Sequence, residues 1–143
     1  AIRECGATTL IDVATLTGAC VVALGDRYTG AFSNSDELMS KIVQASILAG
    51  ENIWRLPMGD EEYDNLNAST VADIANCGKK CGATAAARFL GEFVEKKPWV
   101  HLDIAGTSES DEDTEIYSKG GTGAATMLLY EVVKLMEKPY KSY

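Results

Sequence analysis

The alternation of apolar and polar positions predicts strands and helices that follow one another along the chain. Almost continuous apolar runs at 8–14 and 99–105 are typical of strands buried on both faces. Shorter runs predict three further strands, at 28–33, 53–56 and 71–75. The pattern is therefore that of a sheet with a hydrophobic centre.

Helical spacing of apolar residues predicts a helix that begins after Ser35 or Asn34 and ends at Gly50. Its first turn carries Asp36 and Glu37, which favour the positive end of the helix dipole. Further helices are predicted at 83–94 and 124–136, and shorter ones at 18–24 and 60–66. Alternating strands and helices imply an α/β fold, with a largely parallel sheet and helices on its faces.

Two of the predicted strands share a pattern. Residues 10–15 (LIDVAT) and 101–106 (HLDIAG) are both apolar, carry one internal Asp, and end in Ala and a small residue. Ligands of open α/β sheets bind beyond the carboxyl ends of strands. If these strands are parallel neighbours, their ends line one crevice. Coincidence between two hydrophobic strands is the alternative at this point.

Composition and charge narrow the function classes. The 143 residues suit one domain, 1–143, without a linker or tandem repeat, and a net charge of −8 argues against nucleic acid and anionic membranes. No apolar run approaches the roughly 20 residues of a membrane helix. No signal peptide is recognisable at Ala1, so the four cysteines are expected to be reduced thiols in the cytoplasm. The start reads as the middle of an element, and we expect a fragment of a longer protein.

The turn after the first strand, 15–18 (TLTG), is a candidate site. It lacks the glycine spacing of phosphate-binding loops, and neither Thr15 nor Thr17 has a base in view that could activate it as a nucleophile. A pocket wall is the better interpretation, since Gly18 and Ala19 leave room for a ligand. A helix N-cap with a tight turn is the alternative interpretation.

The single histidine, His101, lies in an apolar strand and is interpreted as a core residue, and no Ser-His-Asp set can be assigned. Asp12 and Asp103 could form a carboxylate pair or bind a metal. We favour a structural role in which each accepts backbone N–H bonds and fixes the adjoining turn.

Three other segments are interpreted as structural. Cys77 and Cys81 have the wrong spacing for a zinc or redox site and are read as thiols in a turn at 78–82. The acidic stretch 108–115 is expected to be a solvated loop, because it lacks the ligand spacing of an EF-hand. The glycine-rich turn at 119–123 is read as a helix entry. The residues alone thus supply no complete catalytic set.

Seven motifs together resemble the leucine aminopeptidase (cytosol aminopeptidase) family, in that family's order and spacing and over essentially the whole chain. They are DVATLTGA (12–19), TGAFSN (29–34), WRLP (54–57), ADIAN (72–76), GATAA (82–86), HLDIAG (101–106) and KGGTG (119–123).

The resemblance implies part of a two-metal exopeptidase that removes N-terminal residues from peptides. Its fold would be a three-layer α/β arrangement with a mainly parallel or mixed sheet and helices on both faces, part of a zinc-exopeptidase-like catalytic domain. Two divalent ions, zinc or manganese, clamp the substrate and activate water in that family. The family's N-T-D-A-E-G-R loop, which carries metal ligands and a catalytic Arg, does not occur in this sequence. The chain would therefore be the C-terminal portion of the catalytic domain, with no catalytic residue and no metal ligand of its own.

The family match assigns this chain a pocket wall. Thr15 and Gly18 match positions that line the pocket for the N-terminal side chain, and Ala105 matches another wall position. The backbone carbonyl of Leu16 would face the substrate or a bound bicarbonate, while Ser108 matches a position of variable size. The resemblance also implies a peptide substrate, a homohexamer and a cytoplasmic location. A non-catalytic, truncated or scaffold-like subunit is the alternative function.

Overall fold

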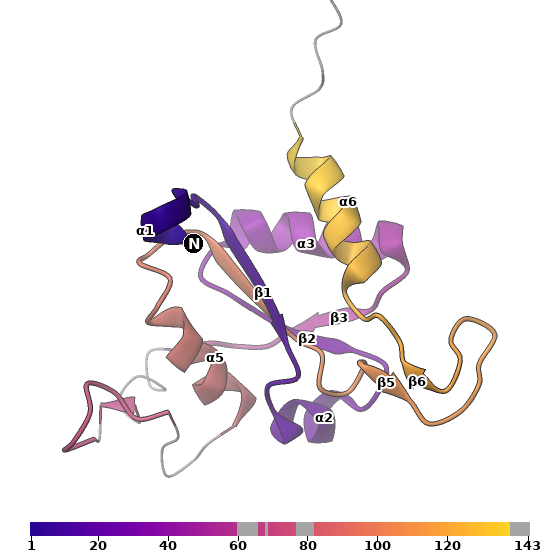
Figure 1. The fold of residues 1–143 in the computed structure, drawn as a ribbon, viewed down its shortest axis with the longest axis horizontal. Helices are drawn as coiled ribbons and strands as arrows, with labels where there is room; N and C mark the ends of the chain where they lie inside the picture. Colours follow the sequence, from indigo (N-terminus) through magenta and orange to yellow (C-terminus); the bar gives the residue numbers. More distant parts are fainter. Residues whose placement is uncertain (60–65, 68, 77–81, 138–143) are drawn as a thin grey trace, which may run out of the picture.

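The computed structural model describes residues 1–59, 66–67, 69–76 and 82–137, and its centre is a four-stranded sheet (Figure 1). The strand order is β1-β4-β2-β3. The strands span Leu10–Ala14 (β1), Thr29–Ser33 (β2), Ile53–Arg55 (β3) and Trp99–Asp103 (β4). Four of the predicted strands are therefore present, each within two residues of its expected limits.

The sheet is mixed. β1 pairs with β4 and β2 with β3 in parallel, whereas β2 and β4 are antiparallel. Of the two alternatives that the shared pattern left open, parallel neighbours or coincidence, the structure shows parallel neighbours, with Ala14 opposite Asp103. As a result, the carboxyl ends of both motifs lie at the same end of the sheet, where β2 begins. There Gly30 of β2 lies opposite Asp103.

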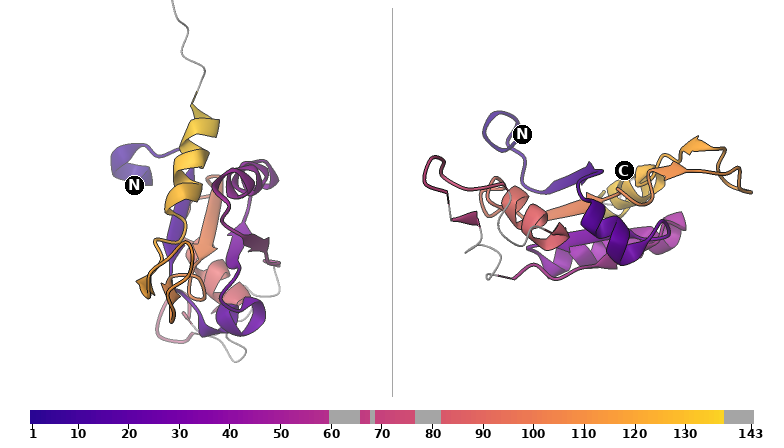
Figure 2. Two further views of the ribbon diagram at one scale, coloured as in Figure 1. Left: turned by 90° about the vertical axis from the view of Figure 1, so that its right-hand side faces the viewer. Right: turned by 90° about the horizontal axis from the view of Figure 1, so that it is seen from below.

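Helices cover both faces of the sheet, which gives the expected three layers. One core cluster joins α3 (Asp36–Ala49) and α6 (Thr126–Met136) to Val100 and Leu102 of β4. The other joins α2 (Gly18–Leu24) and α5 (Ala83–Gly91) to Trp99 of the same strand. The faces alternate along β4 as the pleat requires. The short α1 (Ile2–Cys5) projects from one end of the molecule, and a hairpin of β5 and β6 projects from the other (Figures 1 and 2).

Local caps explain where several helices begin and end. The Ser35 hydroxyl accepts the N–H of Leu38 at the start of α3, and Gly50 ends that helix in the left-handed conformation that glycine tolerates. The start of α6 is capped from a distance. There the Glu51 carboxylate accepts the N–H groups of Ala125 and Leu128.

The structure corrects several predicted elements. The strand expected at 71–75 is wrong: the Ser69 hydroxyl accepts the N–H groups of Val71 and Ala72, so these groups are satisfied within a bend and Val71 is 95% exposed. The expected acidic loop and glycine-rich turn instead contribute the hairpin of β5 (Glu109–Ser110) and β6 (Gly120–Gly121).

Other predictions fall partly or wholly outside the described residues. These are most of the helix at 60–66, most of the turn at 78–82, and the thiols of Cys77 and Cys81. Within the described ranges, none of the helices combines the length and the apolar character needed to cross a membrane.

Candidate functional site: two strand ends joined by a buried carboxylate

The candidate site lies where β1 and β4 end side by side. The carboxylate of Asp103, the last residue of β4, joins the two segments that follow these strands. Its Oδ1 accepts the N–H of Leu16 at 3.1 Å and the N–H of Ala105 at 3.2 Å. Its Oδ2 accepts the hydroxyl proton of Thr17 at 2.7 Å. One buried side chain therefore connects both segments that the sequence marks as pocket walls.

Thr17 extends this network into helix α2. Its hydroxyl oxygen accepts the N–H of Cys20 at 3.0 Å, which caps the first turn of the helix, while its proton goes to Asp103. The hydroxyl thus uses both its donor and its acceptor capacity. The proposed N-cap is confirmed, and the tight turn and the candidate wall are parts of one structure.

Cys20 forms the floor beneath Asp103. It is buried, and its Sγ lies 3.8 Å from the Asp103 carbonyl oxygen, to which the thiol donates. Burial and the nearby Asp103 charge raise the pKa of the Cys20 thiol, against a smaller opposing effect of a hydrogen bond from the Gly30 backbone. Gly30 has no space for a side chain, because a Cβ there would lie 2.6 Å from Cys20 Sγ. The floor is therefore closely packed.

The predicted wall residues differ in exposure. Thr15, Leu16 and Gly18 are exposed on the segment after β1, and a Cβ on Gly18 would meet no atom within 4 Å. Ala105 is half-buried and borders a cavity of about 990 Å³. Thus Asp103 brings Leu16 and Ala105 together through its hydrogen bonds, while Thr15 and Gly18 flank Leu16 on the open side.

Hydroxyl groups and carboxylates line the cavity beside Ala105. Thr29 and Thr107 share a hydrogen bond of 2.8 Å between their hydroxyls, and Thr122 donates to the Thr107 carbonyl at 2.6 Å. Among the described residues that line the cavity, Arg27 is the one cationic side chain, and six side chains carry a carboxylate: Asp26, Glu51, Glu109, Asp111, Glu112 and Glu115. The cavity is polar, acidic and continuous with one wall of the candidate site.

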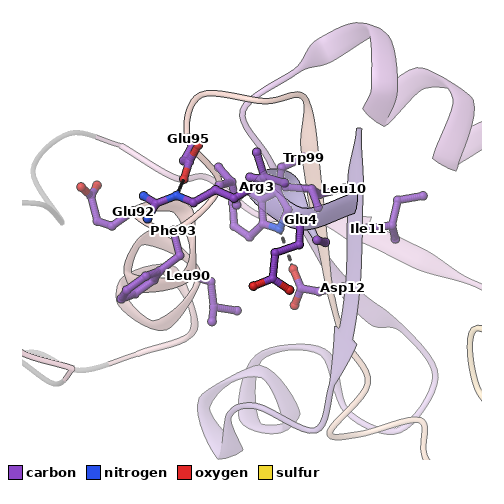
Figure 3. Close-up of a pocket in the computed structure, with 13 residues that line it drawn as sticks. Arg3, Glu4, Leu10, Ile11, Asp12, Leu90, Glu92, Phe93, Glu95 and Trp99 are labelled. Atoms are coloured by element: carbon purple, nitrogen blue, oxygen red, sulfur yellow. Dashed lines mark hydrogen bonds and ion pairs between the residues drawn. The ribbon is translucent and has the colours of Figure 1, made fainter. Parts of the chain in front are cut away.

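A second cluster of polar side chains, centred on Asp12 and His101, lies on the same face of the sheet as Asp103, two residues earlier along β1 and β4. Asp12 accepts the indole N–H of Trp99 (Figure 3). Its other oxygen lies 2.6 Å from Nδ1 of His101. His101 is fully buried and stacks on Phe32 and Trp99. In the described part of the chain its Nε2 has no hydrogen-bond partner, so the ring activates no nucleophile there. The interpretation of His101 as a core residue is confirmed.

The expected structural role of the two aspartates is confirmed only for Asp103. Asp12 accepts bonds from side chains and fixes no turn, because it lies in the middle of β1. The link from Thr17 to Asp103 was missed by sequence reasoning. The signal that could have found it is the shared motif, which places Asp103 beside the turn that contains Thr17.

Comparison with known proteins decides which family this fold and site belong to. The sequence model described as "Cytosol aminopeptidase family, catalytic domain" matches residues 1–130. The chain belongs to the cytosol aminopeptidase family. Probable cytosol aminopeptidases of Alkaliphilus metalliredigens and Alkaliphilus oremlandii are 51% and 48% identical to it over 136 and 134 residues. These matches cover 94% and 93% of the chain but 27% of each relative, so the chain spans about a quarter of their length.

Solved structures of cytosol aminopeptidase relatives share the fold. A mutant of tomato leucine aminopeptidase is similar with a TM-score of 0.81 and 43% identity, over 90% of this chain and 25% of that one. The bottromycin maturation enzyme BotP in complex with Mn is similar with a TM-score of 0.84 and 42% identity, over 92% of this chain and 29% of that one. The α/β architecture of this chain is therefore that of the corresponding part of these enzymes.

Among the described residues, no group of three or more His, Cys, Asp or Glu side chains is placed to hold a metal ion. The two aspartates that sequence analysis considered as ligands are engaged otherwise, Asp12 by Trp99 and His101 and Asp103 by backbone N–H groups and Thr17. Their carboxylates fit a structural role.

Proposed function

We propose that this chain forms a substrate-pocket wall of a metal-dependent aminopeptidase that hydrolyses the N-terminal residue from peptides. The observation that carries the proposal is the joining of Leu16 and Ala105 by the Asp103 carboxylate. Membership of the cytosol aminopeptidase family supports the reaction class. The pocket would lie between the two strand ends, as in other open α/β sheets.

Each wall residue has a role suited to its surroundings. Thr15 and Gly18 would line the space for the N-terminal side chain, and Gly18 offers that space because nothing lies within 4 Å of its missing Cβ. The carbonyl of Leu16 would face the substrate backbone or a bound bicarbonate. Ala105 would form the opposite wall with a side chain small enough to leave the pocket open.

The chemistry belongs, in this proposal, to residues outside the chain. They would hold the two divalent ions, zinc or manganese, and the catalytic groups, while this chain orients the peptide and excludes water on one side. The proposed assembly is a homohexamer in the cytoplasm. Orientation of this kind lowers the barrier because reacting groups meet in a productive geometry.

A segment swap tests the proposal. In the swapped enzyme, this chain replaces the 136 matched residues of the Alkaliphilus metalliredigens relative. With zinc or manganese, we expect hydrolysis of leucine p-nitroanilide within about tenfold of the parent enzyme, which corresponds to about 1.4 kcal/mol of transition-state stabilisation. The isolated chain should hydrolyse none. Metal-dependent turnover by the isolated chain would overturn the assignment of the metal ligands to other residues.

Gly18→Val in the swapped enzyme examines the pocket directly. Because the position is open, the valine should fold without a clash yet occupy substrate space, and kcat/KM for the leucyl substrate should fall by about tenfold or more. Gly82→Val is the matched control, since Gly82 directly precedes helix α5 as its N-cap residue and its missing Cβ meets nothing within 4 Å. Unchanged kinetics in Gly18→Val would contradict the pocket wall. A folded, metal-loaded swapped enzyme without turnover would favour the scaffold-like alternative.

A further inference from the structure

We propose that Asp103 and Thr17 act as a pair of positioning residues that hold the two pocket walls at a fixed separation and thereby set the preference for large over small N-terminal side chains. The inference rests on the proposed function of the walls. It assigns a role in specificity to two side chains that would not themselves contact the substrate.

The first support is the way in which one oxygen spans the site. Asp103 Oδ1 accepts N–H groups from both walls, Leu16 and Ala105, although Leu16 and Asp103 are 87 residues apart in the sequence. The parallel ladder of β1 and β4 reaches Ala14 and Asp103, and the N–H of Ile104 still bonds to the Ala14 carbonyl. Beyond that point the two segments diverge, and the carboxylate continues the connection.

The second support is that the carboxylate is itself held in place. Asp103 is 1% exposed, and Thr17 Oγ1 donates to its Oδ2 at 2.7 Å. Cys20 lies beneath it, at a position that only a glycine at residue 30 allows. Hydrogen bonds to a buried carboxylate are stronger than those between neutral groups. Asp103 and Thr17 therefore form a stiff link between the walls.

The third support excludes a direct chemical role. Both oxygens of Asp103 are already occupied by donors of this chain, and the side chain is buried. A base or metal ligand needs an oxygen that can reach the substrate or ion. The pair can influence the reaction only through the geometry of Leu16 and Ala105, and small displacements of such supporting groups alter function.

Loosening the link should therefore weaken discrimination. A wall that moves loses its close contacts with a leucyl side chain. An alanyl side chain makes fewer contacts with the wall even when the wall is fixed, so it loses less. A pocket distinguishes side chains that differ by a few methyl and methylene groups through such contacts. The measured signature is the ratio of kcat/KM for leucine p-nitroanilide to kcat/KM for alanine p-nitroanilide.

The experiment uses the swapped enzyme with Asp103→Asn, Thr17→Val and Thr17→Ser. We expect the leucyl-to-alanyl ratio to fall by about tenfold in Asp103→Asn and Thr17→Val, mainly through a higher KM for the leucyl substrate. Thr17→Ser keeps the hydroxyl and should restore the ratio to within about twofold of the unmutated value. A loss of folded enzyme alone lowers kcat for both substrates equally and leaves the ratio unchanged.

Two serines supply matched controls away from the site. Ser35→Ala removes an N-cap bond of the kind that Thr17→Val also removes, but at α3. Ser33→Ala removes a buried hydroxyl that donates to the Trp99 carbonyl at 2.6 Å, at the opposite end of β4. Both variants should lower the free energy of unfolding and leave the leucyl-to-alanyl ratio unaltered.

The outcomes separate this inference from the proposed function. An active swapped enzyme whose ratio is unchanged in Thr17→Val overturns the role of the pair and leaves the pocket wall intact. An inactive swapped enzyme, folded and metal-loaded, overturns the proposed function and this inference with it. If Asp103→Asn does not fold, Thr17→Val and its serine counterpart decide the question.

Discussion

The two similar motifs place an aspartate at matching positions, yet the two carboxylates bind different kinds of hydrogen-bond partner. Asp12 of LIDVAT binds the side chains of Trp99 and His101. Asp103 of HLDIAG binds the backbone of Leu16 and Ala105. The same residue in the same local pattern thus stabilises the interior of the sheet in one case and the ends of two strands in the other.

Strand register explains the difference. Asp12 lies opposite His101 and Ala14 lies opposite Asp103, so the two motifs are offset by two residues when their strands pair. An offset of two keeps both carboxylates on the same face of the sheet. It also places Asp12 in the middle of β1 and Asp103 at the end of β4. Only the second position adjoins backbone N–H groups that have no strand partner.

The first prediction breaks the strand-end network. Asp103→Ala leaves the part-buried N–H groups of Leu16 and Ala105 and the Thr17 hydroxyl without their acceptor and opens a cavity at a buried position, and we expect the free energy of unfolding to fall by about 4 kcal/mol. Urea denaturation of the 143-residue chain, followed by far-UV circular dichroism, measures it. A fall no larger than that of Asp12→Ala would contradict the distinction between the two carboxylates.

The second prediction compares the residues that end the motifs, Thr15 and Gly106. A Cβ on Gly106 would lie 2.0 Å from the Gly25 carbonyl oxygen, which is backbone and has little freedom to move. Gly106→Ala should lower the free energy of unfolding by about 3 kcal/mol, as overpacked sites do. Thr15 is exposed, and Thr15→Ala should change it by less than about 0.5 kcal/mol. Equal effects in the same denaturation experiment would show that the close approach at Gly106 is relieved at little cost.

The third prediction concerns the carboxylate of Asp12, in the middle of β1. Asp12→Ala removes the acceptor of Trp99 Nε1 and the partner of His101 Nδ1, but the Asp12 side chain is 42% exposed, so water can enter and replace it. We expect the free energy of unfolding to fall by about 1.5 kcal/mol, less than half of the effect at Asp103. Trp99 fluorescence reports the local change. A spectrum identical to that of the unmutated chain would show that the indole N–H does not depend on Asp12.

Sequence reasoning located the features that depend on neighbouring residues. The limits of α2 and the caps of α3 follow from residues within a few positions, and both were predicted. The shared motif raised the pairing of β1 with β4 as one possibility, with coincidence as the other, and the structure shows the pairing. The strand at 71–75 was wrong because Ser69, only two residues earlier, forms a bend whose hydrogen bonds compete with a ladder.

Long-range polar contacts were beyond sequence reasoning. Glu51 caps α6 from 74 residues away, and Asp103 bonds to Leu16 across 87 residues. Such partners are chosen by the register of the sheet and the packing of helices, which no local pattern encodes. For the candidate site, the two segments proposed as walls could be named from the sequence, whereas the carboxylate that joins them had to be seen in three dimensions.

The smallest predicted effect is a pH dependence of the free energy of unfolding, which arises from the Cys20 thiol beneath the charged Asp103. Burial, and then this charge, raise the pKa of the Cys20 thiol above its ordinary value of 9.0. The unfolded chain therefore releases the thiol proton at a lower pH than the folded chain does. The stabilisation from the neutral thiol is complete below pH 9.0 and is lost as pH rises toward the folded-state pKa.

Cys20→Ala isolates this contribution, because the other cysteines are unchanged in both proteins. The difference in free energy of unfolding between the unmutated chain and Cys20→Ala should be constant from neutral pH to 9.0 and should narrow above it. In the Asp103→Asn background this difference in free energy should begin to narrow at the same pH but stop narrowing at a lower pH, because one of the two causes of the raised Cys20 pKa is gone. A difference that stays constant through alkaline pH would mean that the buried thiol does not experience the carboxylate, and that the floor of the site is wetter than its packing indicates.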